Sequence, residues 1–301
     1  MERESVFRSW YDKGMRREDH WIPALEDALR ILGVIPVIAA GIYRIRYGKG
    51  DPIPYMPNLD WGANYARMLG LPDPLGDFAK LMRMYLNFHS DHEGGNVSAF
   101  TCHTVGSALS DPFYSVSAGI NGLAGPLHGL ANQECLKWIL EIMERFGGVP
   151  TEDQLREFAF QTLRSGQVIP GYGHAVLRVV DPRFTGFLEF GKTYFPDDPV
   201  FLTVERVFNV VPNVLKEFSE ERVKAGKAPI ANIWPNVDAG SGALLYHFGM
   251  VEFPYYTVLF AVSRSMGLLA QYIINRALGT AITRPKSVST FWVKEFASKQ
   301  S

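Results

Sequence analysis

A histidine and two arginines follow a glycine-flanked turn near the middle of the chain. The segment 170–183 reads PGYGHAVLRVVDPR, in which His174 directly follows the turn and Arg178 and Arg183 lie five residues apart. Glycine adopts positive φ without strain and lets the backbone approach a ligand closely. Guanidinium groups bind carboxylates and phosphates through paired, charge-assisted hydrogen bonds. The segment therefore predicts a binding site for an anionic substrate.

Two other segments carry side chains suited to acid–base chemistry. The segment GPLHGLANQE places His128 where a helix is expected to begin, and a helix N-terminus disfavours the imidazolium form. A neutral imidazole can donate a hydrogen bond to a developing oxyanion. The segment PNVDA places Asp238 in a loop, where a carboxylate can approach a substrate. Taken singly, each group also fits a structural role: His128 as a capping residue, His174 bonded to a turn backbone, and Asp238 as a helix N-cap.

One arginine is expected to be buried. Between residues 253 and 275 only Arg264 is charged, and the segment is apolar on most faces of a helix. Such a helix must be buried in the fold. A buried guanidinium needs an anion, because an uncompensated charge in a low-dielectric interior is costly. That anion is either an internal Asp or Glu or a substrate carboxylate.

These motifs, in this order from about Trp10 to about Thr290, resemble the two-histidine, one-aspartate site of the citrate synthases, specifically the eukaryotic mitochondrial type. The resemblance implies condensation of acetyl-CoA with oxaloacetate and water to citrate and CoA through an enolate. It makes Asp238 the base for the thioester methyl group. His128 then donates to the enolate oxygen, and His174 donates to the oxaloacetate carbonyl.

The resemblance also implies the binding groups. The expected oxaloacetate ligands are His92, Arg183, Arg264 and Arg284. Arg284 is expected to reach into the neighbouring site of a homodimer. The expected CoA contacts are the backbone of Val168, Ile169, Gly171, Tyr172 and Gly173, and the Arg178 side chain on a phosphate.

No metal and no further cofactor is expected, since acetyl-CoA is a substrate and the arginines and imidazoles supply the electrostatics. A metal site at His89, His92 and His103 is the alternative, but their spacing fits no familiar zinc pattern.

The sequence departs from the family at three places. Family members carry a helical segment ahead of the point where this chain starts, and that segment supplies at least one further CoA contact. Gly240 stands where the family usually has histidine, which is expected to loosen the loop after Asp238. Residues 216–233 are interpreted as a loop that is longer than the family's and rich in charge, positioned to alter CoA access or to dock a partner.

Helical periodicity dominates the elements that must position these groups, so the predicted fold class is all-α. Thr151 starts a capping box for a helix that runs to about Arg164 and stops at Ser165-Gly166. Further helices are predicted at 24–46, 78–88, 130–146 and 200–221. Residues 97–135, rich in Gly, Ala and Ser, predict a deeply packed region or a subunit interface. The resemblance implies a two-domain helical homodimer, with a large domain at 1–131 plus 244–301 and a small domain at 132–243.

Composition narrows the function classes. A net charge of −1 argues against a nucleic-acid-binding surface. Cys102 and Cys135 are too few for a disulfide framework and are interpreted as buried, reduced thiols. The apolar run 31–43 is taken as too short to span a bilayer, so the chain is expected to be soluble, and the resemblance implies the mitochondrial matrix.

Two rival functions stay open. A 2-methylcitrate synthase would use propionyl-CoA instead, since one methylene changes discrimination by only about 1–3 kcal/mol. A non-catalytic structural subunit would keep the fold without the chemistry.

Overall fold

The computed structural model describes residues 5–91, 93–173 and 177–299, and regular structure within them is entirely helical. Extended segments in this part of the chain meet only at an isolated antiparallel bridge between Tyr172 and Pro235. The predicted all-α fold is therefore confirmed.

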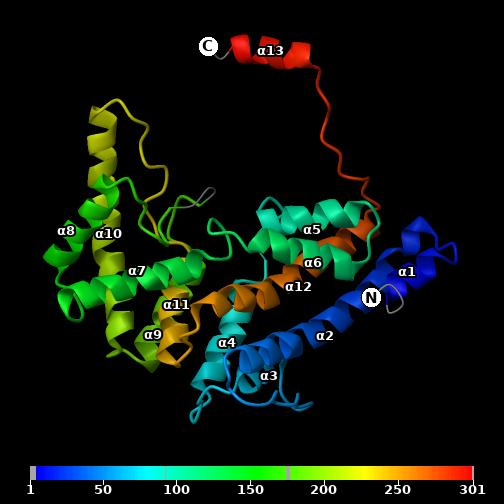
Figure 1. The fold of residues 1–301 in the computed structure, drawn as a ribbon, viewed down its shortest axis with the longest axis horizontal. Coiled ribbons are helices and arrows are strands. Elements are labelled where there is room, and N and C mark those ends of the chain that lie inside the picture. The colour runs from blue at the N-terminus through cyan, green and yellow to red at the C-terminus, as the bar shows by residue number, and fades with distance from the viewer. Residues whose placement is uncertain (1–4, 92, 174–176, 300–301) are drawn as a thin grey trace.

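Figure 1 shows two groups of helices and a separate C-terminal helix. The first group contains α1 (Val6–Tyr11), α2 (Trp21–Arg46), α3 (Trp61–Leu69), α4 (Asp77–Phe88), α5 (Val97–Ser107), α6 (Pro112–Leu123) and α12 (Tyr256–Ala277). The second group contains α7 (Ala131–Phe146), α8 (Glu152–Arg164), α9 (Pro182–Tyr194), α10 (Pro199–Lys224) and α11 (Asp238–His247). Short 3₁₀ turns at Arg17–Asp19 and Phe253–Tyr255 precede α2 and α12. The last helix, α13 (Thr290–Ser298), lies at the end of an extended segment.

Local capping explains why the predicted helices begin and end close to where they were expected. At the start of α8 the Thr151 hydroxyl accepts from the Gln154 backbone N–H at 3.2 Å, and Gln154 Oε1 accepts from the Thr151 backbone N–H at 2.8 Å. This reciprocal pair is the predicted capping box. Gly166 follows the helix with φ of +84°, a conformation that glycine adopts without strain.

The central helix α12 packs against α2, α4, α5 and α6. Small residues permit the close approach to α5 and α6. A Cβ added to Gly119 of α6 would lie 2.8 Å from Leu268 Cδ1 and 3.0 Å from the Ser98 carbonyl oxygen. The small-residue region is thus tightly packed on this side, whereas Val97 and Phe100 of α5 are exposed.

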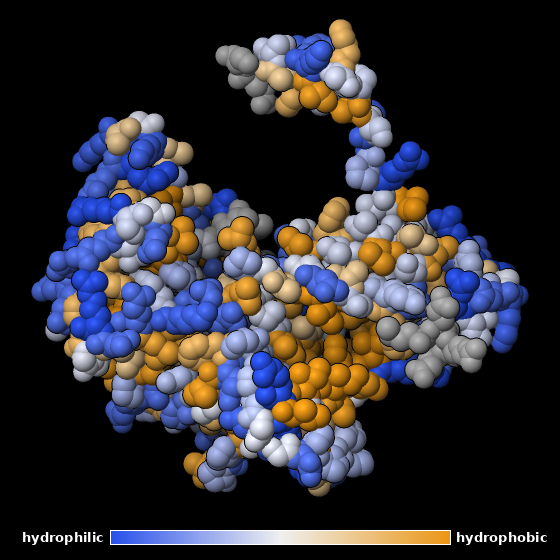
Figure 2. Space-filling view, in the orientation of Figure 1, coloured by the Kyte–Doolittle hydropathy of each residue, from blue (hydrophilic) through white to orange (hydrophobic). Residues whose placement is uncertain are grey.

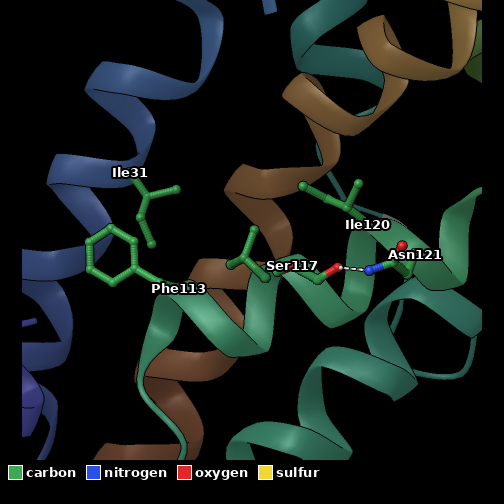
Figure 3. Close-up of a pocket in the computed structure, with 6 residues that line it drawn as sticks. Ile31, Phe113, Ser117, Ile120 and Asn121 are labelled. Atoms are coloured by element: carbon green, nitrogen blue, oxygen red, sulfur yellow. Dashed lines mark hydrogen bonds between the residues drawn. The ribbon is translucent and has the colours of Figure 1, made fainter. Parts of the chain in front are cut away.

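The outer face of α2 is apolar and exposed. Figure 2 shows the hydrophobic patch over this helix. Its exposed large apolar residues are Trp21, Ile22, Leu25, Leu29, Val34, Val37, Ile38, Ile42 and Ile45. Beside it Ile31 of α2 faces Phe113 and Ile120 of α6 across a small hollow (Figure 3). We refer to these exposed α2 residues and the hollow as the apolar flank.

The helix that contains the predicted apolar run 31–43 is longer than the run itself, because α2 extends from Trp21 to Arg46. By length and hydropathy alone, the helical stretches Arg17–Arg46 and Phe253–Ala277 could each cross a bilayer. The apolar window of the second is 61% buried within the fold, against 33% for the first. The second therefore serves as a core helix, whereas the first leaves most of its apolar surface uncovered.

Two predictions about the segments on either side of Asp238 are wrong. Residues 216–224 are the last turns of α10 and not a loop; the loop starts at Ala225. Their charges pair with α8: Arg156 NH1 donates to Glu217 at 3.0 Å, and Arg164 lies 3.4 Å from Glu221. Gly240 lies within α11 rather than in a loop, where an added Cβ would lie 3.2 Å from the Phe184 ring.

Candidate active site

A cavity of about 380 Å³ lies between the two helix groups. Four of the side chains predicted from sequence line it together: His128, Arg183, Asp238 and Arg264. They come from α9, α11, α12 and the turn before α7. Residues far apart in sequence therefore converge on one cavity.

Backbone pairing between two turns positions Asp238. The Gly173 N–H donates to the Trp234 carbonyl at 3.2 Å, and the Asn236 N–H donates to the Gly171 carbonyl at 2.9 Å. The Asn236 side chain extends this pairing: its Nδ2 donates to the Gly173 carbonyl and its Oδ1 accepts from the Asp238 N–H. The glycine-flanked turn and the aspartate segment thus form one unit.

Asp238 is the first residue of α11, and Val237 is the N-cap. The predicted loop position and the alternative N-cap role are both wrong, because the helix begins one residue earlier in the motif than expected.

The Asp238 carboxylate is poorly solvated. Its Oδ1 atom is inaccessible and has no hydrogen-bond partner in the part of the chain that the structure describes. Burial raises the pKa of Asp238 from 3.8 to about 6, and this effect outweighs the opposing influence of Arg183 and Arg264. A carboxylate with such a pKa is a stronger base than an ordinary aspartate and is still largely ionised at neutral pH.

His128 lies in a turn three residues before α7, close to the expected helix start. Its Nε2 is 2.9 Å from the Ser98 hydroxyl, which donates to Asn96 Oδ1 at 2.7 Å. The His128 ring packs edge-on against Phe260. The Ser98 contact fixes the ring orientation and influences which ring nitrogen carries the proton.

Arg264 is 2% exposed, as predicted, and its hydrogen-bond acceptors are neutral. Its Nε donates to the His89 carbonyl at 3.0 Å and its NH1 donates to Asn96 Oδ1 at 3.2 Å. The guanidinium also lies 4.7 Å from the centre of the Phe260 ring. The pKa of Arg264 is lowered to about 10, mainly by burial and also by the nearby Arg183.

No carboxylate of the described residues forms an ion pair with Arg264, so the alternative of an internal pair is not what holds it. Arg183, in contrast, is paired: its NH2 lies 2.6 Å from Asp181 Oδ2, and Asp181 is buried.

The sequence motifs did not single out two buried neighbours of this cavity as parts of the site. His89 stacks on Tyr85 with ring centroids 4.1 Å apart, and both side chains are fully buried. Burial lowers the pKa of His89 to about 3, with Arg183 lowering it further, so its imidazole is neutral. Within the described ranges, His89 Nε2 and the Tyr85 hydroxyl have no hydrogen-bond partner. The only sequence signal was the position of His89 beside the predicted His92 motif.

A second cavity, of about 590 Å³, lies beside the glycine-flanked turn. The predicted residues Val168, Ile169, Tyr172 and Gly173 line it. Gly171 instead packs inward, where an added Cβ would lie 2.8 Å from the Ala239 Cα.

Three basic residues that the sequence analysis did not assign to CoA also line this cavity: Arg164, Arg222 and Lys227. Two of them lie in the charged stretch that was noted for its composition. Arg178 is not among the lining residues; its NH1 donates to the Leu177 carbonyl at 2.8 Å.

The remaining predicted residues lie elsewhere. His92 and His174 fall outside the described residues. Arg284 lies in the exposed segment between α12 and α13 and does not line the first cavity, which we call the cleft.

Metal-binding groups do not cluster in the described ranges: no three His, Cys, Asp or Glu side chains come together there. His103, one member of the alternative metal site, instead contacts Asn275 at 2.7 Å and Thr283 at 3.0 Å. Cys102 and Cys135 are buried free thiols, as predicted, and burial raises the pKa of both.

Known proteins resemble the chain over nearly its whole length. The family described as "Citrate synthase, C-terminal domain" matches residues 4–286. Citrate synthase 4, mitochondrial, of Arabidopsis thaliana is 50% identical over 298 residues, covering 99% of this chain and 60% of the relative. The mitochondrial citrate synthase of Xiphias gladius is 51% identical over 288 residues, covering 95% of this chain and 59% of the relative. The chain thus spans about three fifths of the length of these relatives.

The fold also matches solved structures. The crystal structure of citrate synthase from Pyrobaculum aerophilum has a TM-score of 0.72 and 27% identity, covering 94% of this chain and 66% of that one. The Thermotoga maritima citrate synthase has a TM-score of 0.70 and 26% identity, covering 91% of this chain and 70% of that one.

Proposed function

The chain belongs to the citrate synthase family, and on that premise we propose that it condenses acetyl-CoA with oxaloacetate and water to give citrate and CoA. The observation that carries the proposal is the environment of Arg264. This buried guanidinium has neutral acceptors and lines the same cavity as Asp238 and His128. A dicarboxylate substrate supplies the anion that such a group needs, next to a base and a hydrogen-bond donor.

The first chemical step falls to Asp238. Its carboxylate removes a proton from the thioester methyl group of acetyl-CoA, and its raised pKa improves it as a base. His128 donates a hydrogen bond to the enolate oxygen, where negative charge develops. The enolate carbon then attacks the oxaloacetate carbonyl carbon, polarised by His174, and water cleaves the resulting thioester to release CoA.

Arginines hold the oxaloacetate carboxylates. Arg264 and Arg183 bind from the two helix groups, together with His92. When oxaloacetate binds, Arg183 replaces some of its hydrogen bonds to Asp181 with hydrogen bonds to a substrate carboxylate. Planar guanidinium groups favour such bidentate carboxylate contacts. Arg284 completes the site from the neighbouring subunit of a homodimer, in keeping with its exposed position outside the cleft of its own chain.

CoA binds at the second cavity. The backbone at 168–173 contacts the adenine, and Arg178 binds a phosphate. The basic residues Arg164, Arg222 and Lys227 add positive charge beside it. Both cavities include Gly173, so CoA bound at the second cavity can extend its thioester into the first.

Closure of one helix group on the other excludes water before the enolate forms. The proposed domains are residues 1–131 with 244–301, and 132–243. The proposed boundary between residues 243 and 244 falls within α11. Because a helix moves as a rigid unit, the hinge at this boundary lies at one end of α11. The names of the mitochondrial relatives support a mitochondrial protein, and we place it in the matrix.

Steady-state turnover with acetyl-CoA and with propionyl-CoA, each with saturating oxaloacetate, tests the function. The proposal expects a higher kcat/KM for acetyl-CoA and release of one free thiol per citrate. Preference for propionyl-CoA would identify a 2-methylcitrate synthase. Calorimetry that detects no oxaloacetate binding would leave a non-catalytic subunit as the function.

A further inference from the structure

A third polar cavity, of about 560 Å³, lies at the C-terminal end of α12. It is lined from the turn before α2, the end of α5, the end of α12 and the segment 279–282. Arg276 lies twelve residues after Arg264, which places it about 18 Å along the helix axis from the cleft arginine. This cavity is therefore separate from the proposed oxaloacetate site.

Three basic side chains line this cavity: Arg17, His20 and Arg276. The described residues that line it include no Asp or Glu. The nearest acidic residues in sequence are Glu18 and Asp19, and Asp19 already pairs with Arg16 at 2.9 Å. Among the described residues, the lining thus carries basic groups and no carboxylate, although Glu18 and Asp19 lie close enough to act on His20 from outside the lining.

Arg276 is the most constrained of the three. It is 2% exposed, and its Nε and NH2 atoms have no hydrogen-bond partner among the residues that the structure describes. Burial lowers the pKa of Arg276, and the proximity of Arg17 lowers it further. A guanidinium that loses its water without gaining acceptors is costly to the fold, because each N–H forfeits a strong hydrogen bond.

Two features of the fold offset only part of this cost. Arg276 lies in the last turn of α12, where the helix dipole favours a cation. Its guanidinium also lies 5.5 Å from the centre of the Tyr272 ring. Neither feature supplies an acceptor for Nε or NH2, so among the described residues both donors remain unsatisfied.

The other two cations frame the cavity. Arg17 donates to the Gly279 carbonyl, which connects the turn before α2 to the residues that follow α12. His20 packs between the Phe7 and Tyr11 rings and is 7% exposed. Apolar side chains supply other parts of the lining, namely Met15, Leu109 and Ile282.

We propose that this cavity binds the phosphate or carboxylate group of a small molecule, with Arg276 as the principal ligand and Arg17 and His20 beside it. Oxyanions accept several hydrogen bonds from a guanidinium at once, which satisfies the two donors of Arg276. The apolar part of the lining accommodates the organic part of the ligand.

The position of the cavity gives the bound anion a structural consequence. Residues 279–282 line it, and the next residue, Thr283, is anchored to α5: its N–H donates to Ser107 Oγ at 2.8 Å and its hydroxyl lies 3.0 Å from His103 Nε2. An anion held here fixes the start of the segment that carries Arg284. This consequence rests on the proposed role of Arg284, whereas the anion site itself does not.

Thermal unfolding of the purified chain tests the site, with sodium phosphate compared against sodium chloride at equal ionic strength. Arg276→Leu removes the principal ligand. Arg46→Leu is the matched control, because the Arg46 guanidinium also lies near a tyrosine ring, 5.9 Å from the centre of Tyr47, but on the surface and away from the cavity. Arg17→Gln is a second variant at an exposed position, which cannot disturb the core.

We expect phosphate to raise the melting temperature of the parent and of Arg46→Leu, and to leave that of Arg276→Leu at its chloride value. Without phosphate, Arg276→Leu should be at least as stable as the parent, because it removes an uncompensated buried charge. Isothermal titration should show that Arg276→Leu reduces phosphate affinity at this site about tenfold to a hundredfold. This fold-change corresponds to the usual contribution of hydrogen bonds to charged groups. Arg17→Gln should give a smaller reduction.

Sodium acetate as a second probe separates the two ligand chemistries: a comparable stabilisation by acetate indicates a carboxylate ligand, and stabilisation by phosphate alone indicates a phosphate ligand. Equal phosphate stabilisation of the parent and Arg276→Leu would overturn the proposal. So would a large loss of stability in Arg276→Leu at every phosphate concentration, which would assign Arg276 a purely structural role. Loss of the dimer in Arg276→Leu, with phosphate binding unchanged, would also overturn the proposal. It would show that a second copy of the chain supplies the anion.

Discussion

The cleft and the apolar flank depart from the usual distribution of side chains in opposite directions. In the cleft, Arg264 is 2% exposed and Asp238 keeps an inaccessible carboxylate oxygen that no described residue contacts through a hydrogen bond. On the flank, Leu29 and Ile38 are 61% and 56% exposed, next to an apolar hollow (Figures 2 and 3). One region buries charge and the other exposes hydrocarbon.

The difference indicates what each region binds. A buried charge is stabilised by an ion of opposite sign with matching hydrogen bonds, which a small polar substrate provides. Exposed apolar surface is stabilised by removal from water, at about 25 cal/mol per Å², which requires a broad apolar partner surface. The cleft is therefore suited to a small anion, and the flank is suited to another protein surface, which we take to be a second copy of the chain.

Loss of the base should give the largest effect. We predict that Asp238→Asn lowers kcat by about 10²–10⁴-fold, because the amide cannot accept the methyl proton. Oxaloacetate affinity should change little, since the arginines remain. Glu93→Gln, which alters another acidic residue lining the same cavity, is the control and should retain turnover. Unchanged turnover in Asp238→Asn would remove the proposed mechanism.

Removal of the buried Arg264 guanidinium should give the second-largest effect. We predict that Arg264→Leu weakens oxaloacetate binding by about 2–5 kcal/mol, the usual cost of truncating one partner of a buried charged pair. CoA affinity should fall far less, because its cavity is lined by other residues. Separate calorimetric titrations of the two ligands measure both effects. Equal losses for oxaloacetate and CoA would show that Arg264 is structural.

A charge on the apolar flank should act on association and leave the cleft unchanged. We predict that Ile38→Glu weakens the dimer at least about tenfold, because the carboxylate must be desolvated at the interface. Leu75→Glu, at a residue that is 79% exposed and lies between α3 and α4, is the control. Light scattering over a dilution series measures the dissociation constant. A monomeric parent chain would contradict the proposed dimer and leave the flank free for another surface, such as a bilayer.

The titration of Asp238 should give the smallest of the four effects, because activity and stability change little with pH near neutrality. The pKa of Asp238 is about 6, so kcat/KM should fall about tenfold per pH unit well below pH 6. Because the folded-state pKa lies above the ordinary value, the protonated carboxyl favours folding. This contribution is fully present below pH 3.8 and is lost as the pH rises through 6.

The Asn variant checks the sign of that effect. Asp238→Asn should melt at a higher temperature than the parent at pH 7, and the difference should shrink as the pH falls from 6 towards 3.8, below which it should be nearly absent. An aspartate with an ordinary pKa would give no such pH-dependent difference.

Local sequence signals predicted the helices well. Thr151 with Gln154 predicted the start of α8, and the apolar pattern around Arg264 predicted a buried helix, because caps and periodicity depend on residues within a few positions. The error at residues 216–224 has a related cause. Charged residues on the last turns of α10 resemble a loop in composition, although periodicity already predicted a helix as far as residue 221, and the packing of Arg156 and Arg164 on that helix confirms it.

The sequence by itself determined the family motifs and the residue types available for chemistry, since side-chain identity and order along the chain are local properties. Only the tertiary structure decided their electrostatic environment. Spacing could not reveal that Arg264 has neutral acceptors, that Asp238 is desolvated, or that Arg276 keeps two unsatisfied donors in a separate cavity. These properties depend on which segments pack together and how completely they exclude water, because desolvation and Coulombic interaction act through space rather than along the chain.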